Sequence, residues 1–258
     1  MVSYKNPAEI EKMRQAGLIL YEAMKAVRDA IRPGVSTSEL DHIAEKVIRS
    51  HGAIPTEKGF EGYPGSICAS VDDVVVHGIP SPKVVLREGQ IISIDITASK
   101  DGYQADMART FPVGRISPEA QKLISVSKES FIEGLKAAKC GNRIGDISNA
   151  VQTCVEGYGY GVVRSLCGHG IGKEMHEDPE VPNFGKAGHG LRIREGLCIA
   201  VEPMITQGDW HVYVASDDWA FITRDHSLSA HYENTLAILS DGNPMILTMP
   251  DGIEGEDL

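Results

Sequence analysis

The sequence predicts an α+β fold composed of two similar halves. Two amphipathic helical stretches precede strand-like segments in residues 8–114, and the same order recurs in residues 115–240. Runs of helices followed by runs of strands are typical of α+β architecture. We therefore expect residues 1–252 to form a single domain, with residues 253–258 as a frayed acidic tail.

A fixed offset of 107 residues supports the division into two halves. It aligns Pro33-Gly34 with Cys140-Gly141, and Arg87-Glu88-Gly89 with Arg194-Glu195-Gly196. Self-similarity at one offset is typical of a repeated structural unit. The alternative is chance similarity between amphipathic helices, but chance does not explain why the Arg-Glu-Gly match keeps the same offset.

Four helices are marked by the residues at their ends. Asn6 is a good N-cap, with Pro7 at the first helical position and Glu9 at the third, which together form a capping box. A second capping box begins at Ser36. The predicted helices begin near Asn6, Ser36, Ser117 and Ile144 and end near Pro33, Gly52, Cys140 and Gly157.

Residues 91–98 and 103–111 are predicted to pair as a β-hairpin whose loop is formed by residues 99–102. In that register Asp95 stands directly opposite Asp106 on one face of the sheet. Directly opposed carboxylates repel each other, so both cannot easily be ionised. A divalent cation bound by both would offset the repulsion. The alternatives are a different register or a face that is exposed to solvent.

Composition and charge exclude several classes of protein. The chain has 258 residues, 42% hydrophobic and 24% charged, which is a globular balance. Its net charge of −11 argues against nucleic-acid binding through a broad basic face. It contains no apolar run of the roughly 20 residues that a membrane helix needs, and its N-terminus lacks a signal-peptide hydrophobic region. Five cysteines without a Cys-x-x-Cys motif favour a reducing, cytoplasmic setting.

Further metal ligands are available downstream of the hairpin. His169 stands among glycines, which let the backbone approach a site closely. Glu202 follows an apolar strand and is related to Asp95 by the same offset of 107, and Glu233 precedes another apolar strand. A lone glutamate beside an apolar run is more often a surface residue at a strand end. As a set, four carboxylates and one imidazole fit Mn²⁺, Fe²⁺ or Co²⁺ better than a thiolate-rich structural zinc site.

At these residues the sequence resembles the type I methionine aminopeptidases in their short bacterial form, and the resemblance extends along nearly the whole chain. Any one matching segment is only suggestive, but the ordered set is highly specific. The segments are Gly62-Tyr63-Pro64-Gly65-Ser66-Ile67-Cys68, Val76-His77-Gly78-Ile79-Pro80, Ile92-Ser93-Ile94-Asp95, Gly102-Tyr103-Gln104-Ala105-Asp106, Gly168-His169-Gly170-Ile171-Gly172, His176-Glu177-Asp178-Pro179, Ala200-Val201-Glu202-Pro203-Met204 and Ser229-Ala230-His231-Tyr232-Glu233-Asn234-Thr235.

The resemblance implies the pita-bread fold, in which helices cover a curved antiparallel sheet and two pseudo-symmetric halves surround one site. It also implies two divalent metal ions, Co, Mn, Fe or Zn, bound by five side chains. Asp106 and Glu233 would bridge the two ions, and His169 would bind only one of them. The full set of implied ligands is Asp95, Asp106, His169, Glu202 and Glu233.

The resemblance further implies removal of an N-terminal methionine that is followed by a small residue. A water or hydroxide between the two ions would attack the carbonyl after the methionine, with Glu202 assisting proton transfer. His176 would donate a hydrogen bond to the developing oxyanion. His77 would contact either the scissile amide nitrogen or the second residue of the substrate. The alternative for both histidines is that they are ordinary loop residues whose ring nitrogens are hydrogen-bonded and have no role in catalysis.

The methionine side chain would occupy an apolar pocket. Met175 stands where several relatives carry Phe, and Phe60 where some carry Tyr, so the shape of the pocket can differ from theirs. For the aromatic residues, packing in the core is the competing interpretation. The pocket residues that the resemblance implies are Phe60, Tyr63, Cys68, His77, Met175, His176 and Trp219.

Some relatives bind one monovalent cation, Na⁺ or K⁺, through backbone carbonyls at positions that match Asp72, Val74 and Ser229. The resemblance also implies a monomer that acts on nascent peptides and leaves open a transient contact with the ribosome. It implies neither specific nucleic-acid binding nor membrane association.

Two other functions are compatible with the same fold. A prolidase or Xaa-Pro aminopeptidase usually carries an additional N-terminal domain, which we do not expect in 258 residues that begin with the first helix. A non-catalytic pita-bread binding protein would typically have lost metal ligands, whereas all five are present. Peptide substrates and metal analysis distinguish these alternatives.

Overall fold

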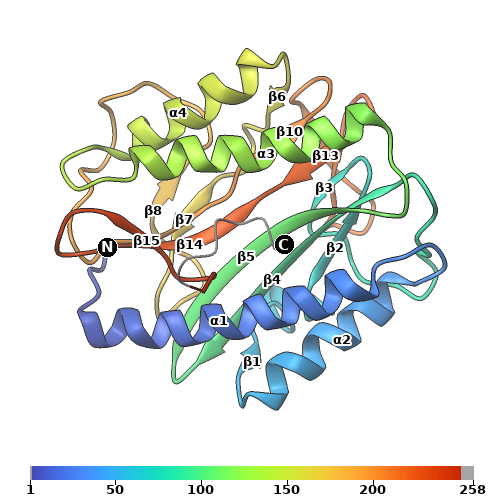
Figure 1. Ribbon diagram of the computed structural model, residues 1–258, viewed down its shortest axis with the longest axis horizontal. Helices are drawn as coiled ribbons and strands as arrows, with labels where there is room; N and C mark the ends of the chain where they lie inside the picture. The colour runs from blue at the N-terminus through green and yellow to red at the C-terminus, as the bar shows by residue number, and fades with distance from the viewer. Residues whose placement is uncertain (1, 251–258) are drawn as a thin grey trace.

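A curved antiparallel sheet occupies the middle of the molecule in the computed structural model, which describes residues 2–250 (Figure 1). The main sheet has the strand order β1-β4-β5-β14-β9-β7-β8, with β2 also paired to β4 and β15 to β14. The elements are α1 (Pro7–Ala30), α2 (Thr37–Ser50), β1 (Ile54–Pro55), η1 (Phe60–Gly62), β2 (Cys68–Val71), β3 (Val74–Val76), β4 (Ile91–Lys100), β5 (Tyr103–Pro112), α3 (Pro118–Ala137), α4 (Ile144–Gly157), β6 (Gly161–Val162), β7 (Gly168–Gly170), β8 (Glu177–Val181), β9 (Cys198–Val201), β10 (Met204–Thr206), β11 (Val212–Val214), β12 (Phe221–Thr223), β13 (Ser229–His231), β14 (Glu233–Ile238) and β15 (Pro244–Ile246).

The helices repeat with the offset that the sequence shows. Helices α1 and α3 end at Ala30 and Ala137, and both ends of α2 recur 107 residues later as the ends of α4. The loop glycines Gly34 and Gly141 also share nearly the same positive φ, 94° and 96°. The predicted α+β fold with two similar halves is therefore confirmed. The predicted acidic tail at 253–258 lies outside the described residues.

The predicted capping residues form the helix starts. The side chain of Asn6 accepts hydrogen bonds from the N–H groups of Ala8 and Glu9, and the carboxylate of Glu9 accepts from the N–H of Asn6. Ser36 and Glu39 form the same reciprocal pair at the start of α2. Such pairs satisfy N–H groups that have no partner within the helix, so the sequence located both starts correctly.

Each half has its own apolar core between its helices and its part of the sheet. In the first half, Ile92, Ile94 and Ile96 of β4 pack in the cluster that α1 and α2 contribute to. Residues of a strand alternate between the two faces of a sheet, so Asp95 points away from the helices. The equivalent cluster of the second half contains Ile199 and other residues of α3, α4, β9 and β14.

The register of the β4–β5 hairpin differs from the predicted one. The loop has two residues, Asp101 and Gly102, because both adopt positive φ, 50° and 79°, as a tight hairpin turn requires. Asp95 therefore pairs with Ala108, and Asp106 pairs with Thr97. The prediction that Asp95 and Asp106 stand directly opposite each other was wrong. Because the shift is two residues, both side chains still share one face and are diagonal neighbours.

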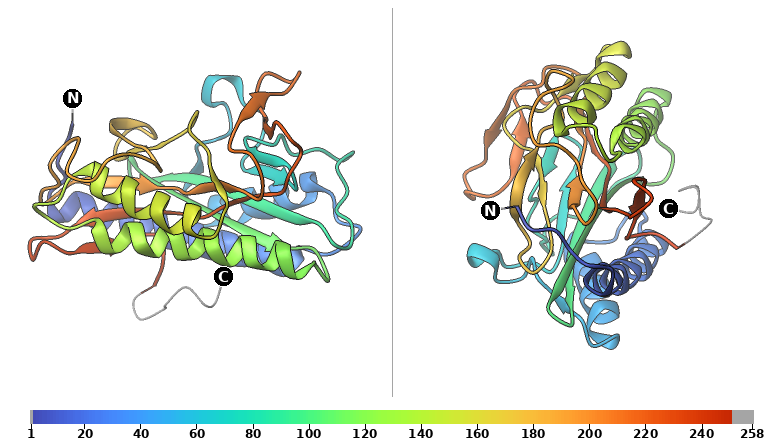
Figure 2. Two further views of the ribbon diagram at one scale, coloured as in Figure 1. Left: turned by 90° about the horizontal axis from the view of Figure 1, so that it is seen from above. Right: turned by 90° about the vertical axis from the view of Figure 1, so that its left-hand side faces the viewer.

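The helices lie against one face of the sheet, and loops surround the other face (Figure 2). Strands β5 and β14 are neighbours at the centre, where the two halves of the chain meet. The face opposite the helices is therefore lined by residues from both halves. Within residues 2–250, no helix has both the length and the apolar character required to span a membrane.

Candidate metal centre

The five predicted ligand residues meet on the face of the sheet that the helices leave uncovered. Asp95 lies on β4, Asp106 on β5 and His169 on β7, while Glu202 follows β9 and Glu233 begins β14. The Nε2 atom of His169 lies 3.7 Å from an oxygen of Asp106 and 3.5 Å from an oxygen of Glu202. Donor atoms of Asp106, His169 and Glu233 all lie within 4.8 Å of one another.

The position of His169 depends on the glycines beside it. A Cβ atom on Gly168 would collide with the carbonyl of Ala200, and one on Gly170 would collide with the carbonyl of Asp178. The neighbouring strands can therefore approach only because both residues lack a side chain. The Nδ1 atom of His169 lies 2.9 Å from the carbonyl oxygen of Gly170. A proton on Nδ1 makes this hydrogen bond and leaves Nε2 as the nitrogen that faces the carboxylates.

Burial and mutual repulsion dominate the electrostatics of the cluster. Burial raises the pKa of Asp106, and the charges of Glu233 and Asp95 raise it further. Burial likewise raises the pKa of Glu202 and of Glu233, each with added repulsion from neighbouring carboxylates. Burial lowers the pKa of His169 to about 4, so its ring is neutral at neutral pH. A neutral imidazole facing several carboxylates is suited to binding a cation.

Two cavities meet at this cluster. One has a volume of about 290 Å³ and the other of about 650 Å³. Five residues line both of them, so the cluster lies at their junction. The shared residues are His77, Asp95, His169, His176 and Glu202.

The smaller cavity contains most of the predicted substrate pocket. Its lining includes Phe60, Tyr63, Cys68 and Trp219, together with His77 and His176. The rings of Tyr63 and Trp219 meet edge to face at 5.0 Å, and the Tyr63 hydroxyl donates to the carbonyl of Gly78 at 2.9 Å. The predicted pocket residue Met175 is buried, and the lining of neither cavity includes it.

The two predicted catalytic histidines flank the junction of the cavities. The ring of His176 lies 4.3 Å from the ring of His169, at nearly a right angle to it. His77 has a positive φ of 60°, which is uncommon for a residue with a side chain, and its ring packs edge to face on Phe221. Burial lowers the pKa of both His77 and His176, so both are neutral donors at neutral pH.

Comparison with known proteins connects this arrangement to a family of enzymes. Residues 11–240 match the model of metallopeptidase family M24. The methionine aminopeptidase of Clostridium acetobutylicum is 54% identical to the chain, with 96% of this chain and 99% of the relative covered. The chain belongs to the methionine aminopeptidases of metallopeptidase family M24. The methionine aminopeptidase 1 of Bacillus subtilis is 46% identical, with 94% and 97% covered.

Solved structures of other proteins show the same fold. A crystal structure of the methionine aminopeptidase from Thermotoga maritima matches with a TM-score of 0.95 at 38% identity, covering 97% of this chain and all of that one. A prolidase from Pyrococcus furiosus matches with a TM-score of 0.74 at 21% identity, and the match covers 66% of that chain. At that identity the prolidase shares the pita-bread fold alone.

The donor atoms of this metallopeptidase fit divalent metal ions. Buried polar atoms usually have a hydrogen-bond partner, and an exception requires an explanation. Oxygens of Asp95, Asp106 and Glu233 are buried without a partner, and so are both ring nitrogens of His231. All of these atoms can bind a metal ion. The ion or ions of an M24 metallopeptidase would satisfy them.

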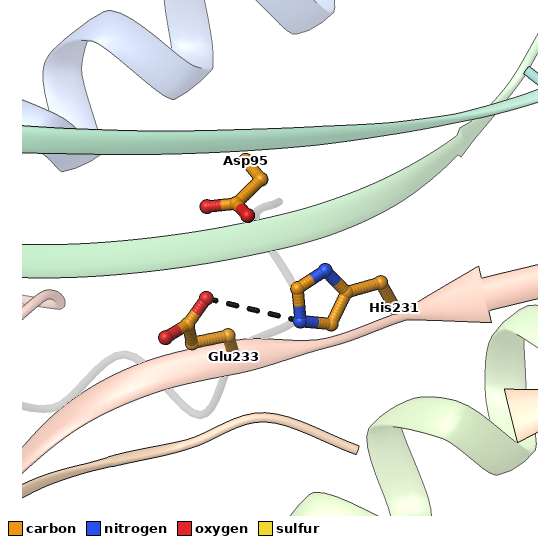
Figure 3. Close-up of side chains that lie close together, drawn as sticks. All are labelled: Asp95, His231 and Glu233. Atoms are coloured by element: carbon orange, nitrogen blue, oxygen red, sulfur yellow. Dashed lines mark ion pairs between the residues drawn. The ribbon is translucent and has the colours of Figure 1, made fainter. Parts of the chain in front are cut away.

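Sequence reasoning did not single out two residues of the site, His231 and Glu57. His231 lies beside Asp95 and Glu233, and donor atoms of these three residues lie within 4.8 Å of one another (Figure 3). Glu57 lines the smaller cavity, where its carboxylate accepts from the Thr97 hydroxyl at 2.6 Å. The spacing of two residues between His231 and Glu233 is compatible with one shared face in extended chain, but it does not distinguish a ligand from a core residue.

Two of the three residues predicted to bind a monovalent cation are hydrogen-bonded to each other. The carbonyl oxygen of Asp72 accepts a hydrogen bond from the N–H of Ser229 at 2.9 Å, so these two residues are in contact. Val74 begins β3, two residues after Asp72. Binding of Na⁺ or K⁺ by the three carbonyls stays a prediction.

Proposed function

We propose that this chain hydrolyses the peptide bond after an N-terminal methionine when the second residue is small, and that nascent proteins are its substrates. The observation that carries the proposal is the meeting of Asp95, Asp106, His169, Glu202 and Glu233 at the junction of two cavities. When bound, two divalent ions would supply a nucleophilic water at neutral pH and polarise the substrate carbonyl.

We assign the five residues as the ligands of these ions, with Asp106 and Glu233 shared between them. Donor atoms of Glu233 belong to two groups that could each hold one ion, one with Asp106 and His169 and one with Asp95 and His231. This double membership supports a bridging role for Glu233. Carboxylates and imidazole are compatible with Mn²⁺, Fe²⁺, Co²⁺ and Zn²⁺, and availability of the metal would select among them.

His176 and His77 are positioned to act on the substrate itself. His176 would donate a hydrogen bond to the oxygen that becomes negatively charged in the transition state, because it is neutral and adjoins His169. His77 would contact the amide nitrogen or the second residue, since it lines both cavities. Glu202 lines both cavities as well and would carry a proton toward the leaving amine.

The two cavities would divide the substrate at the scissile bond. The smaller cavity would hold the methionine side chain, because aromatic rings and the Cys68 thiol form much of its wall. The larger cavity would hold the residues that follow the methionine. Nascent chains carry this methionine in the cytoplasm, and the five free cysteines of the chain suit that reducing compartment.

The test is cleavage of Met-Ala-Ser by protein stripped of metal and then supplied with Mn²⁺, Fe²⁺, Co²⁺ or Zn²⁺ singly. We expect free methionine with at least one ion and none with the stripped protein. Met-Trp-Ser and an Xaa-Pro peptide serve as controls, and both should be cleaved at least about 100-fold more slowly. Failure with every ion, or a preference for the Xaa-Pro peptide, would refute the proposed function.

A further inference from the structure

His231 is a fully buried imidazole that faces the metal centre. Its relative exposure is 1%, and both of its ring nitrogens lack a hydrogen-bond partner. Figure 3 shows the ring directed toward the gap between Asp95 on β4 and Glu233 on β14. Burying a polar ring without a partner is costly, so its position here points to a ligand.

The backbone of His231 is held firmly at this position. The hydroxyl of Thr110 accepts a hydrogen bond from the N–H of His231 at 2.8 Å and donates to its carbonyl at 3.0 Å. The same hydroxyl lies 2.8 Å from that of Ser93, which connects β13 to both strands of the central hairpin. The ring is therefore presented by a rigid part of the sheet rather than by a loop.

The distances around His231 suit a shared ion. Its Nε2 atom lies 3.8 Å from an oxygen of Glu233 and 3.9 Å from an oxygen of Glu202. These separations are too long for hydrogen bonds. Two atoms bound to one ion are separated by at most the sum of two bonds, about 4.2 Å for nitrogen and oxygen ligands of Zn²⁺. The corresponding distances from His169, 3.5 and 3.7 Å, fall in the same range.

We propose that Nε2 of His231 is a sixth ligand of the metal centre and binds the ion that Asp95 and Glu233 hold. This inference rests on the proposed function and adds a residue to its metal site. Each of the two ions then has one imidazole, His169 for the first and His231 for the second. Imidazole nitrogen favours Zn²⁺ and Co²⁺ over Mn²⁺, so His231 makes the second position more selective than carboxylates alone would.

The direct test is an NMR titration of the full chain, labelled with ¹⁵N in its histidine rings, with Zn²⁺ at one and two equivalents. Coordination changes the chemical shift of the bound ring nitrogen. We expect one coordinated imidazole at the first equivalent and a second at the second equivalent. A single coordinated imidazole at two bound equivalents would overturn the proposal, and this result requires no variant to fold.

A substitution assigns the second signal. In His231→Gln the second coordinated imidazole should be absent while that of His169 stays. The affinity of the second ion should fall at least about tenfold more for Zn²⁺ than for Mn²⁺, because only the imidazole contribution is removed. Equal losses for both ions would contradict direct ligation. His42→Gln, at an exposed position of α2, is the matched control and should change neither measurement.

Methionine release from Met-Ala-Ser is measured on the same samples. If the wild-type protein binds two ions through two imidazoles but releases no methionine, the proposed function fails and the ligand assignment stands. If it releases methionine with only one imidazole coordinated, the assignment of His231 fails alone.

Discussion

The ammonium group of Lys5 lies 2.6 Å from the carboxylate of Glu177, the residue that follows His176. Both side chains are largely buried, with 5% and 14% of their surfaces exposed. The same carboxylate accepts hydrogen bonds from the Ser3 hydroxyl at 2.8 Å and from the N–H of Lys173 at 2.9 Å. The N-terminal segment therefore fixes the loop that presents His176 to the metal centre.

Replacing Lys5 by Met should weaken both the fold and the activity. Removing one partner of a buried ion pair leaves the other charge uncompensated, which costs about 3 kcal/mol. We expect the free energy of unfolding in urea to fall by about that amount and kcat to decrease because His176 is less well positioned. Ser3→Ala, which removes only an exposed hydrogen bond, should lower the unfolding free energy by less than about 1 kcal/mol. Equal losses in the two variants would contradict a special role for Lys5.

Replacing His176 by Ala should separate catalysis from metal binding. The histidine is not among the proposed ligands, so metal content should stay close to that of the wild type. Loss of one oxyanion donor typically lowers kcat by about 100- to 1000-fold. Metal analysis and steady-state kinetics on the same preparation check both parts. Unchanged kcat would remove His176 from the mechanism.

The stability of the metal-free protein should fall as pH rises. Burial and neighbouring charges raise the pKa of Asp106 and Glu233 in the folded state. The folded state then holds more protons than the unfolded one, so stability is lost as pH increases above about 4, the ordinary pKa of these groups. In Asp106→Asn one such group is absent. The variant should therefore gain stability relative to the wild type as pH rises from about 4 to 7.

Added metal should reverse the order of stability of the wild-type protein and Asp106→Asn at neutral pH. A metal ion binds the deprotonated carboxylates, so the loaded wild-type protein should become more stable between about pH 4 and 7. Asp106→Asn should bind metal poorly and gain little from it. Urea unfolding at several pH values, with a chelator or with added metal, provides both measurements. A wild-type advantage over the variant that persists at pH 7 in chelator would be inconsistent with the repulsion described above.

Replacing Glu57 by Leu should change the selectivity of the smaller cavity. The carboxyl of Glu57 lines the smaller cavity together with the aromatic rings and the Cys68 thiol. A hydrocarbon side chain packed against this carboxyl would remove water from it without offering a hydrogen bond. The comparison peptide is norleucine-Ala-Ser, in which a methylene replaces the methionine sulfur. We expect the ratio of kcat/KM for Met-Ala-Ser over that for norleucine-Ala-Ser to fall about fivefold in the variant, which corresponds to loss of about one hydrogen bond to the sulfur. The ratio does not depend on metal loading, because a change in the loaded fraction alters kcat/KM for both substrates equally.

A second substitution controls for the loss of charge. Glu61→Gln alters a carboxylate that lines the same cavity but is exposed at its edge. It should leave the ratio of the two substrates within about twofold, less than the loss of one hydrogen bond. A fivefold change there, or none in Glu57→Leu, would show that general charge rather than the Glu57 carboxyl governs selectivity.

The sequence predicted the helices well because their ends depend on local patterns. Capping boxes at Asn6 and Ser36 specify helix starts within one turn, so no tertiary information is needed. The hairpin register was mispredicted because Ser99 and Lys100 were assigned to the loop, whereas Asp101 and Gly102 suffice for the turn. A dipeptide of Asp and Gly is the stronger indication of a two-residue loop.

Glu57 and His231 were missed for a different reason. Glu57 lies between the short strand β1 and the segment η1, and only the folded sheet brings it next to Thr97. His231 lies in a strand whose other residues are buried, so nothing in its local pattern separates a ligand from a core residue. Contacts between distant segments decide both cases, and a single sequence does not contain them.

The junction of β5 and β14 has a consequence for how the protein loses its fold. Asp95 and Asp106 come from the N-terminal half of the chain, and His169, Glu202 and Glu233 come from the C-terminal half. Neither half alone carries a complete donor set, so ions held by all five residues would bind tightly only while the two halves are together. The binding energy of the metal ions would oppose separation of the two halves directly. The ions would therefore link the halves as well as take part in catalysis.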